Sequence, residues 1–67
     1  MLLSELDVEL GARFLVGGRL DEAIEVLEAA LRDLPAGSDA RRPALRDVSL
    51  AYLYRGRQRL NESEDAQ

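Results

Sequence analysis

The 67-residue sequence contains no cysteine, histidine, lysine or tryptophan. Without Cys and His there are no disulfides, no thiolate nucleophile and few ligands for zinc or haem, so we expect neither a metal site nor a cofactor. No apolar run approaches the roughly 20 residues that span a bilayer. Met1-Leu2-Leu3 is followed at once by Ser4 and Glu5, unlike a signal peptide. We therefore expect a cytoplasmic protein that does not bind membranes.

The charges form three blocks of alternating sign. Residues 1 to 36 carry a net charge of -5, residues 37 to 60 carry +4, and residues 61 to 67 carry -3. All nine basic residues are Arg, which reflects either a GC-rich or heat-adapted genome or the forked pairing of Arg with carboxylates at interfaces. Blocks of opposite charge can pair within one molecule or between copies. Their alternation argues against a basic surface that binds nucleic acid.

Apolar residues recur at intervals of three and four and never alternate for long, which predicts an all-α fold. We expect the first helix to begin near Ser4, as its N-cap, and to end at Gly17 and Gly18 because glycine enters the left-handed region at little cost. Asp21 is expected to cap the second helix, and Pro35 is expected to end it.

Residues 36 to 42 form the predicted linker, and Pro43 suits the first turn of a third helix. Gly56 is expected to end or bend that helix. The expected organisation is one three-helix domain over residues 1 to 60, followed by a polar, frayed tail over residues 61 to 67.

The helices carry more apolar surface than three of them can cover. The second has one apolar face: Ala23, Ile24, Leu27, Ala30, Leu31 and Leu34. The first has two stripes, one of Leu3, Leu6, Leu10 and Phe14 and one of Val8, Ala12, Leu15 and Val16. The third repeats this arrangement, with Leu45, Val48 and Tyr52 on one stripe and Leu50, Leu53 and Tyr54 on the other. Either a partner covers the surplus, or residues such as Leu15, Val16 and Tyr54 are exposed singly, as is normal on protein surfaces.

An internal repeat is visible at a shift of 38 residues. Leu10-Gly11-x-x-Phe14 and Gly18 align with Val48-Ser49-x-x-Tyr52 and Gly56. The first copy, continued by Asp21-Glu22-Ala23, Leu27, Ala30 and Pro35, resembles the tetratricopeptide repeat (TPR). The second copy matches only a first helix, so the resemblance covers about one and a half repeats. A generic three-helix bundle whose leucines imitate the motif is the alternative.

The resemblance implies an antiparallel helical hairpin plus a third helix, with small residues at the helix contacts. The residues expected to pack in the repeats are Leu10, Gly11, Phe14, Gly18, Ala23, Leu27, Ala30, Pro35, Leu45, Val48, Ser49, Tyr52 and Gly56. TPR proteins bind partners in a groove lined by the first helix of each repeat. By resemblance the groove residues are Val8, Ala12, Leu15, Val16, Arg46, Leu50, Leu53 and Tyr54.

These features predict a protein-binding scaffold that self-associates, most simply as a homodimer, or that binds an amphipathic helix of a partner. The alternative is a fragment of a larger TPR-containing regulator or sensor. Catalysis is not expected, because no His is present to activate a serine, and Glu22, Glu25 and Glu28 read as a solvated helix face.

Overall fold

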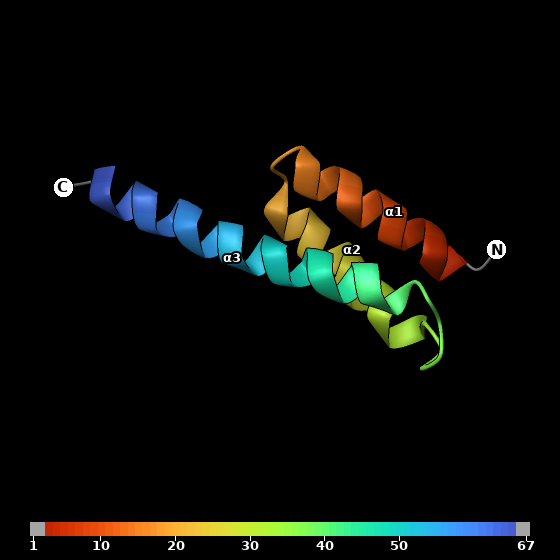
Figure 1. The fold of residues 1–67 in the computed structure, drawn as a ribbon. Helices are drawn as coiled ribbons and strands as arrows, with labels where there is room; N and C mark the ends of the chain where they lie inside the picture. Colours follow the sequence, from red (N-terminus) through yellow and green to blue (C-terminus); the bar gives the residue numbers. More distant parts are fainter. Residues whose placement is uncertain (1–2, 66–67) are drawn as a thin grey trace.

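The computed structural model describes the backbone of residues 3 to 65 and the side chains of residues 3 to 62. It contains helices α1 (Leu3–Val16), α2 (Leu20–Asp33) and α3 (Arg41–Asp65). α1 and α2 run antiparallel as a hairpin, and α3 runs back along α2 in the direction of α1 (Figure 1). No strand occurs among the described residues, so the predicted all-α fold is confirmed.

α2 is the central helix. α1 and α3 each pack along α2 and meet each other over a shorter stretch. Leu27 has no exposed surface, and burying a leucine side chain contributes about 2 kcal/mol. The core consists of Val8 from α1, Ala23, Ile24, Leu27, Ala30 and Leu34 from α2 and its end, and Ala44, Val48 and Ala51 from α3.

The turn between α1 and α2 is a Schellman motif. Gly18 has a φ of 79°, in the left-handed region that favours glycine. The Arg19 amide donates to the Phe14 carbonyl at 2.9 Å, and the Gly18 amide donates to the Leu15 carbonyl at 3.1 Å. These bonds satisfy carbonyls at the end of α1. The prediction that Gly17 and Gly18 end the first helix is therefore confirmed.

α2 ends just before Pro35. Leu34 has a ψ of 134°, the extended backbone that a following proline favours. Arg41, in the first turn of α3, donates from Nη1 to the Leu31 carbonyl at 2.9 Å and to the Leu34 carbonyl at 3.0 Å. The guanidinium thus meets the negative end of the α2 dipole and fixes the start of α3 against α2. Pro43 lies in the same first turn, as predicted.

Two predicted helix caps are wrong. α2 begins at Leu20, its N-cap is Arg19, and no side chain bonds the free amides there. Leu20 is buried, so the helix starts one residue ahead of Asp21, which lies in the first turn. Ser4 lies within α1 and is buried on the same side as Val8, so it packs instead of capping.

α3 is longer than the sequence predicted. It continues through Gly56 to Asp65, so of the two predicted effects of Gly56, ending or bending the helix, the first is wrong. Good helix formers flank this glycine, and one glycine inside a helix costs only about 1 kcal/mol. The predicted domain boundary after residue 60 falls inside α3, and residues 66 and 67 of the predicted tail lie outside the described residues. From Gly56 to Glu62 every residue is exposed, and this end of α3 projects past the hairpin (Figure 1).

Candidate functional site

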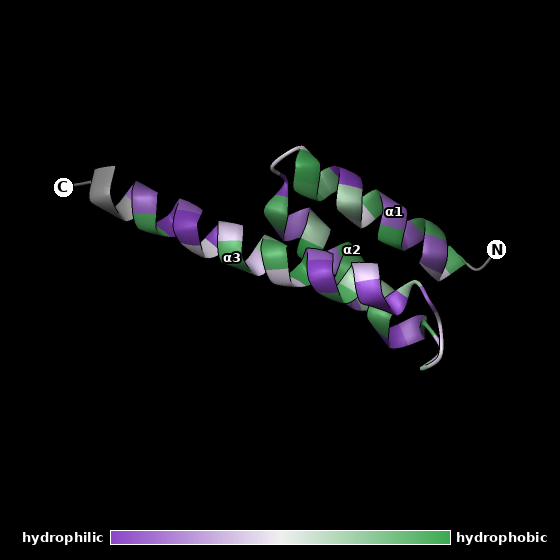
Figure 2. Ribbon diagram, viewed as in Figure 1, coloured by the Kyte–Doolittle hydropathy of each residue, from purple (hydrophilic) through white to green (hydrophobic). Residues whose placement is uncertain are grey.

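Besides the apolar side chains that are buried in the core, several large apolar side chains are exposed on the surface. Their exposed fractions range from 40% for Leu10 to 89% for Val16. Figure 2 shows hydrophobic residues recurring along α1 and the first half of α3, whereas the projecting end of α3 is mostly hydrophilic. Scattered apolar residues are normal on surfaces, so their grouping decides whether they form a site. The exposed set is Leu3, Leu6, Leu10, Val16, Leu45, Tyr52, Leu53, Tyr54 and Leu60.

Three of these residues form an exposed face of α1, which we call the α1 stripe: Leu3, Leu6 and Leu10. Their steps of three and four residues place them on one side of the helix. The buried residues of α1, which are Ser4, Val8 and Gly11, repeat at the same steps on another side. α1 therefore has one apolar face in the core and a second one in solvent.

α3 also has an exposed face, which we call the α3 stripe: Leu45, Ser49, Tyr52, Leu53, Gly56 and Leu60, with Tyr52 at its edge beside α2. All six residues are exposed, and they recur at steps of three and four residues. A Cβ added to Gly56 would meet no atom within 4 Å, so α3 is uncovered at this position. Ala44, Val48 and Ala51, which contribute to the core, lie on the opposite side of α3.

The eight residues predicted to line a groove do not form one surface. Val8 belongs to the core, because it lies on the side of α1 that packs against α2. Ala12, Leu15 and Leu50 are half-buried, and Val16, Arg46, Leu53 and Tyr54 are exposed. Of these eight residues, only Leu15 and Tyr54 line a common depression.

That depression, which we call the end groove, lies where α3 projects past the turn between α1 and α2. Its volume is about 410 Å³. The hairpin contributes Leu15, Gly18 and Leu20, and α3 contributes Tyr54, Arg57, Gln58, Asn61 and Glu62. The hairpin wall carries the apolar side chains of Leu15 and Leu20, and the α3 wall is mostly polar.

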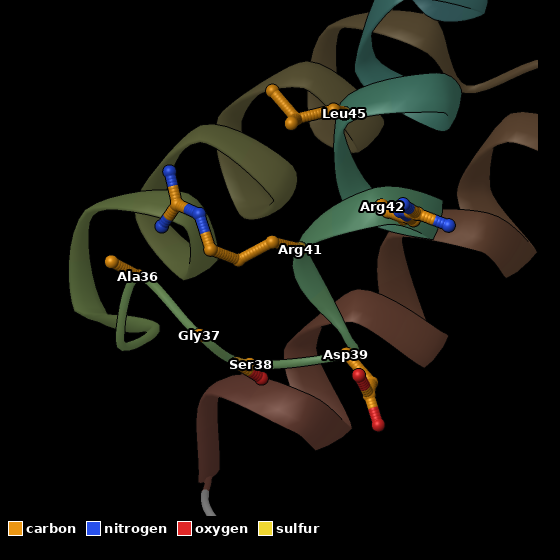
Figure 3. Close-up of a pocket in the computed structure, with 7 residues that line it drawn as sticks. All are labelled: Ala36, Gly37, Ser38, Asp39, Arg41, Arg42 and Leu45. Carbon is orange, nitrogen blue, oxygen red and sulfur yellow. The ribbon is translucent and has the colours of Figure 1, made fainter.

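A second depression of about 690 Å³ lies beside the loop between α2 and α3 (Figure 3). Arg41 reaches toward the end of α2, and Arg42 points to another side (Figure 3). Arg41 Nη1 donates to the Leu31 and Leu34 carbonyls, and the Ser38 hydroxyl accepts from the Ala40 amide at 3.3 Å. Because both side chains bond backbone groups, we assign Arg41 and Ser38 a structural role. The lining of this depression is Ala36, Gly37, Ser38, Asp39, Arg41, Arg42 and Leu45.

The residues predicted to pack in the repeats divide between the core and the surface. Gly11, Ala23, Leu27, Ala30 and Val48 are buried, and Phe14 is half-buried against the core. Leu10, Gly18, Pro35, Leu45, Ser49, Tyr52 and Gly56 are exposed. Gly11 packs in the hairpin, whereas Ser49, its counterpart at a shift of 38 residues, faces outward. The repeat therefore places similar residues in different surroundings.

Polar contacts join α2 to the middle of α3. Arg55 Nη1 lies 3.2 Å from Asp21 Oδ1, and the Arg55 guanidinium lies 4.9 Å from the centre of the Tyr52 ring. The Tyr52 hydroxyl donates a hydrogen bond to the Glu28 carboxylate. This bond, together with partial burial and the charge of Glu28, raises the pKa of the Tyr52 hydroxyl above its ordinary value.

The side of α3 that packs against the hairpin was only partly predicted from the sequence. Val48 was expected to pack, whereas Ala44, Asp47 and Ala51, which are buried on the same side, were not identified. Their steps of three and four residues were a usable signal. Asp47 is only 5% exposed, and its carboxylate lies 3.2 Å from Arg46 Nε. Leu60 was also missed, although it follows Leu53 by two helical turns.

No protein-family model, curated protein or solved structure matches this sequence. Within the part of the chain that the structure describes, no helix is long and apolar enough to cross a bilayer. No group of three or more potential metal ligands gathers among these residues either.

Proposed function

We propose that this chain is a protein-binding module that self-associates as a homodimer through apolar surfaces of α1 and α3. The observation that carries the proposal is the presence of two exposed apolar stripes on helices whose other faces already fill the core. The resemblance to the TPR family, whose members bind proteins, points the same way. A composition without cysteine suits a cytoplasmic location for such a module.

The apolar surface area that folding leaves exposed is the source of free energy for association. A chain of 67 residues buries a smaller share of its surface on folding than a larger domain does. Removing apolar surface from water contributes about 25 cal/mol per Å², so covering a few hundred Å² yields several kcal/mol. That gain is comparable with the whole stability of a small domain. Association is therefore a means of stabilising this fold.

We propose no catalytic role for the chain. Its serines have no histidine to activate them, and it has no cysteine. In the loop depression Arg41 bonds backbone carbonyls at the end of α2, and the end groove presents Arg57, Gln58, Asn61 and Glu62 on a single helix. Such a helix face is suited to contact with another polypeptide.

Thermal unfolding at several protein concentrations tests the proposal. Because association stabilises only the folded chain, the unfolding midpoint rises with concentration if the chain dimerises. Replacing Leu53→Glu and Leu60→Glu, which are 56% and 60% exposed, removes apolar contact while leaving the core intact. We expect this α3-stripe variant to lose the concentration dependence and to keep its helicity at low concentration.

The matched control is Arg32→Ala with Ala36→Glu. It lowers the net charge by the same two units at exposed positions outside both stripes. We expect this control to retain the concentration dependence of the wild type. A wild-type midpoint that is independent of concentration would refute self-association.

A further inference from the structure

We propose that the α1 stripe of one copy docks on the α3 stripe of a second copy, and that charges beside the stripes select this pairing. The inference rests on the proposed function and specifies which faces meet. Each copy carries one α1 stripe and one α3 stripe, so a two-fold arrangement buries both kinds of stripe in both copies.

Opposite charges lie beside the two stripes. On α1, Asp7 is four residues from Leu3 and three from Leu10, and Glu9 is three residues from Leu6, so both acids neighbour the α1 stripe. Neither acid forms an ion pair among the described residues. Arg13, three residues beyond Leu10, is the basic residue at the far end of this stripe.

The surroundings of the α3 stripe are mainly basic, with the acidic Glu28 of α2 at the Tyr52 edge. Arg42 is three residues before Leu45, Arg57 is four residues after Leu53, and Arg59 is three residues after Gly56. All three arginines are exposed, and none takes part in an ion pair or hydrogen bond among the described residues. An acidic α1 and a basic α3 attract one another, whereas contacts between two α1 stripes or two α3 stripes oppose like charges.

The two stripes differ in length. The α1 stripe from Leu3 to Leu10 is about 11 Å long at 1.5 Å per residue, within a helix of 14 residues. The α3 stripe from Leu45 to Leu60 is about 22 Å long by the same rise. Ser49 and Gly56 leave low points between the large side chains of this stripe.

A second copy covers more of the exposed apolar surface than a single helix from another protein does. A foreign helix on the α3 stripe leaves the α1 stripe in water, whereas reciprocal docking covers both. A stable interface buries at least about 600 Å² on each partner, which is roughly one eighth of the 4850 Å² that one copy exposes. The two stripes, with the charged side chains beside them, offer an area of that order.

Charge reversal followed by mixing tests the pairing. One variant carries Asp7→Arg and Glu9→Arg, and the other carries Arg42→Glu, Arg57→Glu and Arg59→Glu. In either variant alone, like charges meet at both contacts, so we expect dimerisation to weaken at least about tenfold. In an equimolar mixture, every α1 stripe has a complementary α3 stripe, so we expect a heterodimer by sedimentation velocity. Circular dichroism of each variant establishes that it is helical.

The control reverses charges on the outer side of α2, with Glu25→Arg and Arg32→Glu, and is expected to dimerise like the wild type. If either reversed variant dimerises normally, or if the helical variants stay monomeric when mixed, the pairing is wrong although the wild type remains a dimer. If the wild type itself is monomeric at every concentration, the proposed function fails, and with it the pairing.

Discussion

Gly11 of α1 lies so close to Leu27 of α2 that a Cβ on Gly11 would be 2.5 Å from both Cγ and Cδ2 of Leu27. Carbon atoms in contact are normally about 3.5–4.0 Å apart, so no methyl group fits there. Leu27 has no exposed surface and lies in the middle of the core. The close packing of α1 against α2 therefore depends on the absence of a side chain at Gly11.

Replacing Gly11→Ala is expected to lower the free energy of unfolding by about 1–2 kcal/mol, because overpacking outweighs the gain in helix propensity. Gly56→Ala is the matched control, since its added methyl meets open space. It is expected to raise the free energy of unfolding by about 0.5–1 kcal/mol. Urea unfolding in the background of the α3-stripe variant measures both without dimerisation. A Gly11→Ala chain as stable as the Gly56→Ala chain would disprove the close contact.

Arg41 anchors α3 to the end of α2 through two backbone carbonyls. Replacing Arg41→Ala leaves the Leu31 and Leu34 carbonyls without this donor, so we expect a loss of about 1–3 kcal/mol by urea unfolding. Measured in the α3-stripe variant, which does not dimerise, Arg42→Ala removes the same charge from an exposed side chain and is expected to stay within about 0.5 kcal/mol of the parent. Equal effects of the two substitutions would show that Arg41 acts only through its charge.

The hydrogen bond from Tyr52 to Glu28 makes stability depend on pH in the alkaline range. The pKa of Tyr52 is raised in the folded state, so the folded chain holds this proton more tightly than the unfolded chain does. The contribution is fully present below the ordinary tyrosine pKa of about 10 and is lost as the pH rises through the folded pKa. We expect Tyr52→Phe to reduce the loss of stability on going from neutral pH to about pH 11.

Tyr54→Phe is the control for this prediction, because Tyr54 lies on the same helix and forms no described hydrogen bond to α2. Urea unfolding at neutral and alkaline pH gives the comparison. Identical pH dependence in the Tyr52→Phe chain and the parent would contradict the role of the bond.

The parts of the fold that follow from local chemistry could be predicted from the sequence. Gly18 takes a positive φ that other residues rarely adopt, and Pro35 imposes extended backbone on Leu34, so both helix ends were predictable. The apolar face of α2 was predictable because the central helix buries its one apolar side.

The features that could not be predicted from the sequence depend on which helix faces pack against each other. α1 has two apolar sides, and its pattern does not say that Val8 enters the core while Leu3 and Leu6 stay in solvent. On α3, the side that carries small residues packs against the hairpin. Ala44 and Ala51 are therefore in the core, whereas Leu53 is exposed. Gly56 was misread because a glycine without a positive φ is tolerated within a helix.

Sedimentation equilibrium of the unmodified chain over a wide concentration range tests the central claim most directly. The claim is that a second copy covers the exposed stripes, so the mass should approach twice the 7.4 kDa of one chain as concentration rises and fall toward 7.4 kDa on dilution. The α3-stripe variant should remain at the single-chain mass throughout. A fully helical wild-type chain that sediments at 7.4 kDa at every concentration would contradict the account.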